Sequence, residues 1–175
     1  MIEDKIRAAS SKRQSYGGTK FTPEPEGATP LGQGVPTLKT GVYREFSPML
    51  RKRFELHGRW ERATHATWLS LDDMESLWQE RAENHLRAAF KIQAAALKED
   101  WPNHATGLFK EERLSLFAVS DLNSESMVLL WLDFEPEPEV WVYDANGESR
   151  YKNLEVYLDS YLADDVSAAR RSWRA

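Results

Sequence analysis

The chain has 175 residues, of which 41% are hydrophobic and 29% are charged, a composition typical of one soluble globular domain. It contains no Cys, which excludes disulfide scaffolds and Cys-ligated zinc sites. The longest strictly apolar run, 127–132, is far shorter than the roughly 20 residues of a membrane helix, and the charged start has no apolar signal segment. We therefore expect a cytoplasmic protein that binds no membrane.

Charge is distributed unevenly along the chain, whose formal net charge is −5. Residues 1–62 hold 12 Lys/Arg and 7 Asp/Glu, a net charge of +5, whereas residues 111–165 hold 14 Asp/Glu and 3 Lys/Arg, a net charge of −11. Such an acidic segment repels nucleic acid and attracts a basic partner over about a Debye length. An ordinary solubilising surface has the same charge pattern, so both interpretations stay open.

The N-terminal part is predicted to be a helix followed by an arm. Apolar residues recur at helical spacing within residues 1–15. Residues 17–41 hold six of the nine Gly and four of the eight Pro, which disfavours regular structure. We therefore divide the chain into an N-terminal helix and Gly/Pro-rich arm, 1–43, and a single domain, 44–175.

Two further helices are predicted in the middle of the chain. Ser47 is a suitable N-cap, Pro48 fits the first helical position, and Gly58 ends the helix. Ser70 caps the next helix, because acidic residues follow it at the positive end of the helix dipole. Apolar residues then recur at steps near 3.6, which predicts one long amphipathic helix over 71–98.

The C-terminal part changes to the period of strands. Apolar residues within 114–118 and 127–134 predict two buried strands, and 140–143 predict a third that ends at the turn 144–147. Asn153 then caps a helix with a clean apolar stripe. Consecutive strands on short links pair antiparallel. We therefore predict an α+β fold, an antiparallel meander with helices packed on one face.

Familiar catalytic motifs are absent from the sequence, including the Walker loop, Gly-x-Ser-x-Gly and His-Glu-x-x-His. His57, Glu61 and His65 have metal-like spacing, but they share one face only if the helix continues through Gly58. His85 falls on the apolar side of the long helix, where a semi-buried structural histidine is expected. The sequence therefore predicts no enzyme, no cofactor and no metal.

Four carboxylates occupy alternate positions around two prolines: Asp133, Glu135, Glu137 and Glu139. On a regular strand they would lie on one side. They lack the Gly- and Asn-rich pattern of a calcium loop, and nothing else supports a general acid–base pair. A charged edge that deters strand pairing and a surface that recognises a basic protein both stay open.

Aromatic residues near these carboxylates are candidate anchors for a protein partner. The candidate partner-binding set has eight members. Besides the four carboxylates it contains three aromatic residues and one further aspartate: Trp131, Trp141, Tyr143 and Asp144. For the aromatic residues the alternative is packing within the sheet, because alternation turns some of them inward.

Basic residues on the predicted second helix and its flanks could form a ridge for nucleic acid: Arg44, Arg51, Lys52, Arg53, Arg59 and Arg62. Phe54 and Trp60 would accompany them. A single short cluster is usually a solvated helix face, and the chain as a whole is acidic, so a nucleic-acid partner is disfavoured.

Four motifs follow one another in the C-terminal part. Residues 116–121 read Leu-Phe-Ala-Val-Ser-Asp, a strand ends in Leu-Asp-Phe at 132–134, residues 138–144 read Pro-Glu-Val-Trp-Val-Tyr-Asp, and residues 151–158 read Tyr-Lys-Asn-Leu-Glu-Val-Tyr-Leu. This order resembles the C-terminal half of the SUKH superfamily, which contains a yeast cell-wall-synthesis regulator and many bacterial toxin-immunity proteins.

The resemblance implies a non-enzymatic immunity protein of bacterial competition that binds and neutralises a toxin. An acidic surface would speed the capture of a basic cognate toxin, so we predict such a partner. An adaptor or structural protein-binding domain of a phage or mobile element stays open as the alternative. The sequence also leaves open whether the protein is a homodimer.

Overall fold

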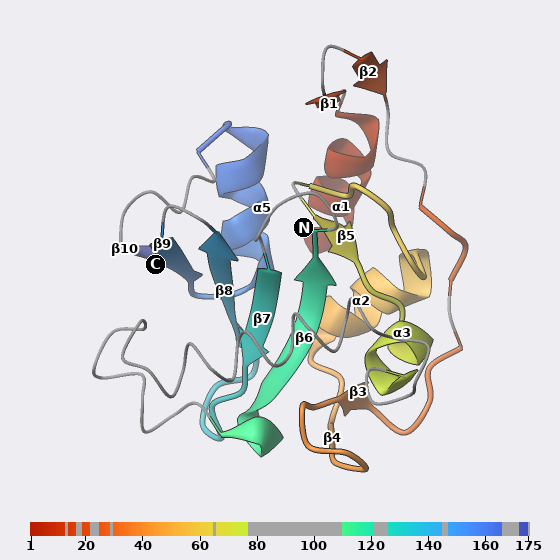
Figure 1. Ribbon diagram of the computed structural model, residues 1–175, viewed down its shortest axis with the longest axis vertical. Coiled ribbons are helices and arrows are strands. Elements are labelled where there is room, and N and C mark those ends of the chain that lie inside the picture. Colours follow the sequence, from red (N-terminus) through yellow and green to blue (C-terminus); the bar gives the residue numbers. More distant parts are fainter. Residues whose placement is uncertain are drawn as a thin grey trace.

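The computed structural model describes residues 1–12, 14–16, 19–21, 25–28, 30–64, 66–76, 110–120, 126–144, 147–165 and 172–174. The helices are α1 (Ile2–Ser11), α2 (Pro48–Leu56), α3 (Leu71–Glu75) and α5 (Leu154–Leu162), with a 3-10 turn at Glu111–Arg113. The strands are β1 (Gln14–Tyr16), β2 (Thr19–Phe21), β3 (Val35–Pro36), β4 (Tyr43–Arg44), β5 (Thr67–Trp68), β6 (Leu114–Val119), β7 (Ser126–Leu130), β8 (Glu139–Asp144), β9 (Gly147–Tyr151) and β10 (Ser172–Arg174). The fold is α+β, as predicted (Figure 1).

The main sheet has six strands in the order β10-β9-β8-β7-β6-β5. All neighbours from β5 to β9 pair antiparallel, whereas β10 joins β9 in parallel. Strands β6 to β8 therefore form the predicted meander, since consecutive strands on short links pair with each other, and β9 extends it by one strand. Two smaller sheets, β1-β2 and β3-β4, are antiparallel hairpins.

The sequence does not predict strand β9, which follows the expected turn after β8. Asp144 pairs with Gly147 where the two strands meet. The residues that follow Gly147 are mostly polar, so β9 has little of the apolar character that predicts a strand. Ser149 and Tyr151 of β9 are nevertheless buried. Burial on this strand comes from its place in the sheet, which local sequence does not encode.

Capping residues explain why the helices begin where they do. Ser47 accepts a hydrogen bond from the backbone N–H of Leu50, and Asn153 accepts one from that of Val156. Ser70 forms a complete capping box, in which Asp73 accepts a hydrogen bond from the Ser70 backbone N–H. Each device satisfies backbone donors that a helix leaves unpaired at its start, and all three starts agree with the predictions.

The prediction of a long helix is tested only at its start, and the prediction that residues 17–41 lack regular structure is wrong in part. Of the long helix expected over 71–98, α3 is described, and the remainder from 77 onward lies outside the described residues, as do His85 and His104. Regular structure does occur within 17–41, where β2 pairs with β1 and β3 pairs with β4. These strands are two or three residues long and pair with neighbouring segments, so Gly and Pro around them are compatible with the pairing.

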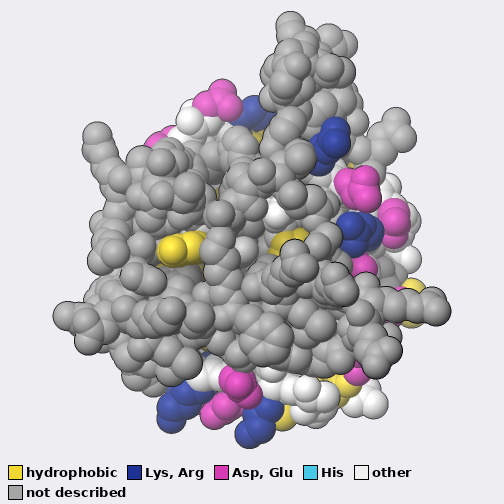
Figure 2. All heavy atoms as spheres, viewed as in Figure 1, with side chains coloured by type: hydrophobic (Ala, Val, Ile, Leu, Met, Phe, Trp, Pro, Cys, Tyr) yellow, Lys and Arg dark blue, Asp and Glu magenta, His cyan; other side chains and the backbone are white. Residues whose placement is uncertain are grey.

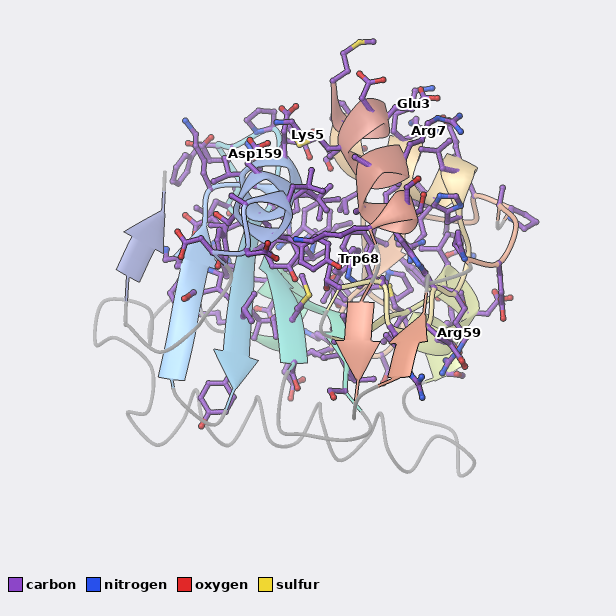
Figure 3. All side chains as sticks on the ribbon, turned by 90° about the horizontal axis from the view of Figure 1, so that it is seen from above. Glu3, Lys5, Arg7, Arg59, Trp68 and Asp159 are labelled. Carbon is purple, nitrogen blue, oxygen red and sulfur yellow. The ribbon has the colours of Figure 1, made fainter. Side chains whose placement is uncertain are left out.

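Helices α1, α2 and α5 pack against one another on one face of the sheet (Figures 1 and 3). Ile6 and Ala9 of α1 are fully buried in the common core. Lys5 pairs with Asp159 of α5 at 2.7 Å and with Glu155 at 3.1 Å. The N-terminal helix therefore contributes directly to the core that holds α5 against the sheet.

Aromatic rings fill the core between α2 and strands β5 and β6. The Trp60 and Trp68 ring centroids lie 5.2 Å apart, and those of Trp68 and Phe117 lie 4.8 Å apart. Arg53 is fully buried among these rings, with its guanidinium 4.3 Å from the centre of the Phe54 ring. Burying a large aromatic side chain contributes about 1.5–3 kcal/mol, so this cluster is a major source of stability.

Candidate functional site

The segment that joins β7 to β8, residues 131–138, is here called the acidic loop. It contains Asp133, Glu135 and Glu137, so three of the four alternating carboxylates lie in a loop and not on a strand. The prediction that β7 extends to residue 134 is wrong, since β7 ends at Leu130. The prolines in this segment interrupt strand pairing, and the carboxylates therefore do not share one face.

Asp133 attaches the acidic loop to two neighbouring elements. Its carboxylate lies 3.3 Å from Nη1 of Arg44 on β4 and 2.8 Å from Nη2 of Arg113, the last residue of the 3-10 turn. Arg44 also donates from Nε to the backbone oxygen of Glu112 at 3.0 Å. Acidic and basic side chains accordingly gather at the lower edge of the molecule in Figure 2. Two cations on one carboxylate fix the position of this part of the loop.

Glu137 attaches the other end of the loop to α2. Its Oε1 accepts a hydrogen bond from the backbone N–H of Met49 at 2.9 Å, in the first turn of α2. Burial raises the pKa of Glu137, and hydrogen bonds from Ser47 and Met49 oppose that rise. A carboxylate beside a helix start also interacts favourably with the helix dipole. Glu137 therefore holds the loop against α2, whereas the sequence suggested an exposed group that contacts a partner.

Phe134 stands at the tip of the acidic loop and is 81% exposed. Asp133 and Glu135 flank it, and both are exposed. The Glu135 N–H donates to the Leu132 backbone oxygen at 3.1 Å, which closes a turn that contains Phe134. A large apolar side chain is thus displayed between two carboxylates, on a backbone that is tied down on both sides.

Three members of the predicted partner-binding set are buried and are not available for contact. Trp131 is 8% exposed and donates from Nε1 to Ser115 Oγ at 2.9 Å. Trp141 is fully buried and donates from Nε1 to Glu139 Oε2 at 3.0 Å. Both tryptophans belong to the hydrophobic core, Trp141 on β8 and Trp131 directly after the end of β7.

Glu139 is the third buried member, with 5% exposure. Arg150 on β9 donates to both of its oxygens, from Nε at 2.8 Å and from Nη2 at 2.9 Å. The same guanidinium lies 4.8 Å from the centre of the Trp141 ring. A bidentate pair covered by an aromatic ring neutralises this carboxylate inside the fold, so Glu139 belongs to the packing of β8 on β9.

The remaining members of the set are Tyr143, which is half-buried on β8, and Asp144, whose side chain lies outside the described residues. Of the eight predicted residues, the structure leaves these two exposed carboxylates together at one place: Asp133 and Glu135. Phe134 lies between them and is missing from the prediction. The prolines that follow it indicate a loop, and that signal marks Phe134 as a loop residue.

The histidines with metal-like spacing do not form one helix face. Helix α2 ends at Leu56, so His57 and Glu61 do not share a helix face, and His65 lies outside the described residues. Within the part of the chain that is described, no group of three or more His, Asp or Glu side chains is arranged to hold a metal ion.

The predicted basic ridge is not continuous. Arg53 is buried, Arg44 is paired with Asp133, and Arg59 lies 3.2 Å from Asp73. The two aromatic residues expected to accompany the ridge, Phe54 and Trp60, are fully buried. The exposed cations of α2 make separate contacts: the Arg51 guanidinium lies 5.4 Å from the centre of the half-buried Phe46 ring, and Lys52 pairs with Glu55 at 3.2 Å.

No helix in the described ranges has both the length and the apolar character needed to cross a bilayer. Compared with protein-family models, with curated proteins and with solved structures, the chain matches none of them.

Proposed function

We propose that this protein is a non-enzymatic, cytoplasmic immunity protein that binds and neutralises a basic toxin through the acidic loop. The observation that carries the proposal is the 81% exposure of Phe134 between Asp133 and Glu135. The contact set accordingly contains these three residues and omits the buried Trp131 and Trp141.

An exposed aromatic residue on a fixed loop is suited to anchor a protein partner. Aromatic anchors that enter a pocket dominate the energy of many interfaces. Ordering a mobile loop on binding lowers affinity, and here the ion pairs of Asp133 and the Glu137–Met49 hydrogen bond hold the loop beforehand. Single exposed apolar residues are common on protein surfaces. Phe134 differs from an ordinary one because contacts on both sides hold its loop in place.

Charge supports a basic partner. Residues 111–165 carry a net charge of −11, and the acidic loop lies within this segment. Complementary charge raises the association rate, and it does so most at low ionic strength. The resemblance of residues 114–162 to the SUKH superfamily adds the expectation that the partner is a toxin.

The proposal is tested by capture from cells of the native host. Tagged wild-type protein, Phe134→Ala and Glu135→Lys are each purified, and proteins that co-elute in stoichiometric amount are identified by mass spectrometry. We expect one basic protein with the wild type, little of it with either variant, and growth arrest when that protein is expressed alone.

Glu55→Lys is the matched control, because it reverses one exposed carboxylate on α2 and leaves the acidic loop unchanged. Equal capture by wild type and Phe134→Ala would contradict the proposal. Several weakly bound proteins in similar amounts would favour the adaptor function instead.

A further inference from the structure

A small half-open pocket lies between the β3–β4 hairpin and α3, and none of the contacts discussed so far uses it. Its empty volume is about 250 Å³, part of it continuous with solvent, and its lining includes Thr37, Val42, Tyr43, Met74 and Glu75. Because that volume includes open solvent, the enclosed space is far smaller than a drug-sized ligand needs, and it admits at most the end of one side chain.

The lining combines apolar walls with one charged group. Met74 is buried and Val42 is half-buried, so they offer apolar surface. Glu75 is exposed at the mouth, where its carboxylate accepts a hydrogen bond from the Tyr43 hydroxyl. That hydrogen bond raises the pKa of Tyr43, which therefore stays a neutral donor.

Thr37 and Val42 use polar groups in hydrogen bonds within the hairpin. Thr37 donates from its backbone N–H and from Oγ1 to the Val42 oxygen, at 3.0 and 2.8 Å. The Val42 N–H donates to the Lys39 oxygen at 3.0 Å. Among the described residues, Glu75 has no cationic partner. The described part of the pocket therefore presents a carboxylate, positioned by Tyr43, beside an apolar wall.

This chemistry matches a basic side chain. Lys and Arg place their alkyl stems along apolar surface and keep the charged group at a polar edge. A carboxylate with free lone pairs accepts charge-assisted hydrogen bonds from either cation. A neutral or acidic side chain would leave Glu75 without compensation when a partner covers the pocket.

The pocket and the acidic loop lie on either side of β4. Tyr43 and Arg44 are consecutive residues of this strand, and successive strand residues point to opposite sides. Tyr43 contacts Glu75 of α3, whereas Arg44 contacts Asp133 of the acidic loop. Figure 1 shows β4 at the lower edge of the molecule, with α3 above it. The pocket and the acidic loop thus adjoin the same two-residue strand.

We infer that the pocket between the β3–β4 hairpin and α3 binds a Lys or Arg side chain of the protein's basic partner, with Glu75 as its counter-ion. This inference rests on the proposed function, and it adds a second contact whose chemistry is defined. In this account Phe134 supplies an apolar anchor, and Glu75 adds a contact that selects a cation.

The pocket is tested directly with blocked amino acids by NMR of ¹⁵N-labelled protein. N-acetylarginine amide and N-acetyllysine amide are titrated separately, and neutral N-acetylcitrulline amide is the matched ligand control. We expect saturable shifts at the amides of Val42, Tyr43 and Glu75 with at least one cationic probe, and none with citrulline. Comparison of the two cationic probes shows whether the pocket prefers Arg or Lys.

Glu75→Gln keeps the size of the side chain and removes its charge, and should weaken binding of the cationic probe about fivefold, as expected for a partly exposed ion pair. Glu45→Gln removes one exposed charge near β4 and should leave the titration unchanged. Equal shifts with citrulline, or unchanged affinity in Glu75→Gln, would overturn the inference.

Partner capture separates the inference from the proposed function. If both hold, Phe134→Ala and Glu75→Gln each reduce capture of the same basic protein, the latter about tenfold or more because the partner excludes water from the pocket. If Phe134→Ala abolishes capture and Glu75→Gln binds normally, the inference fails and the proposed function stands. If neither variant changes capture, the proposed function fails.

Discussion

Glu137 and Met49 join the acidic loop to α2: the Glu137 carboxylate accepts the Met49 backbone N–H at 2.9 Å. This hydrogen bond satisfies a helix N-terminal donor from a residue 88 positions away in the sequence. A helix start is thus completed by the loop that displays Phe134. The stability of α2 and the conformation of the loop are therefore linked.

The link makes stability depend on pH in a defined direction. Burial raises the pKa of Glu137 above its ordinary value of 4.5, so the folded protein holds this proton more tightly than the unfolded chain does. As pH rises above 4.5 the unfolded chain releases its proton first, and the contribution of Glu137 to stability falls until the raised pKa is passed. Wild type should therefore lose stability relative to Glu137→Gln as pH rises from 4 to 7.

Urea unfolding of both proteins at a series of pH values measures this difference. Gln keeps an oxygen that can accept the Met49 N–H and has no charge to desolvate. Glu137→Ala removes the acceptor and should lower the free energy of unfolding by about 1 kcal/mol, the usual effect of losing a capping group. The explanation would be contradicted if the free energy of unfolding of wild type, relative to that of Glu137→Gln, stayed the same at every pH or decreased as pH falls.

Arg53 is predicted to be essential for stability. It is fully buried, donates to the backbone oxygens of His57 at 2.6 Å and Leu69 at 3.0 Å, and burial lowers its pKa to about 9. Arg53→Ala leaves two carbonyl groups unpaired and a cavity among aromatic rings, so the free energy of unfolding should fall by about 3–5 kcal/mol.

Arg53→Lys should also destabilise the protein, because an ammonium group does not reproduce the fork that reaches both carbonyl oxygens. Arg51→Ala, on the exposed side of the same helix, is the control and should change stability by about 0.5 kcal/mol or less. Chemical denaturation measures all three. Loss of less than about 1 kcal/mol in Arg53→Ala would show that these contacts contribute little.

Gly34 is predicted to be required for the position of β4. Its φ is +153°, and a Cβ at this residue would lie 2.5 Å from the backbone oxygen of Arg44. Gly34→Ala must displace β4, so we expect a loss of about 1–3 kcal/mol in the free energy of unfolding. Gly32→Ala is the control, since a Cβ there meets nothing within 4 Å. If Gly34→Ala and Gly32→Ala are equally stable, the backbone of Arg44 does not lie as close to Gly34 as described.

Helix α1 is predicted to stabilise the whole fold through Ile6. This side chain is fully buried, so Ile6→Ala should lower the free energy of unfolding by about 2–4 kcal/mol. Ala8→Ser changes an exposed position of the same helix and should have little effect. If the two variants unfold at the same urea concentration, then α1 is independent of the remaining core.

Local sequence signals predict the helix starts and most of the sheet. Ser47, Ser70 and Asn153 bond to backbone groups three residues away, so their roles depend on neighbours that the sequence displays. The buried runs of β6 and β7 are equally local. Strand β9 is different, because its burial depends on pairing with β8 and on the helix that covers it.

The candidate site could be located from the sequence only in part. The acidic character of the loop is visible, but the ties of Asp133 come from Arg44, 89 residues away, and Arg113, 20 residues away. Trp141 and Glu139 are buried because Arg150 on the adjacent strand pairs with the carboxylate. Which residues of an acidic aromatic segment stay exposed is thus decided by tertiary contacts.

Neutralisation through Phe134 is the central claim, and growth rescue measures it most directly. The captured partner is expressed in a heterologous host with wild type, Phe134→Ala or Glu55→Lys, after unfolding curves have established equal stability. We predict that wild type and Glu55→Lys restore growth and that Phe134→Ala, whose ring is exposed, folds normally but fails to rescue. Full rescue by Phe134→Ala at the same protein level would contradict the claim.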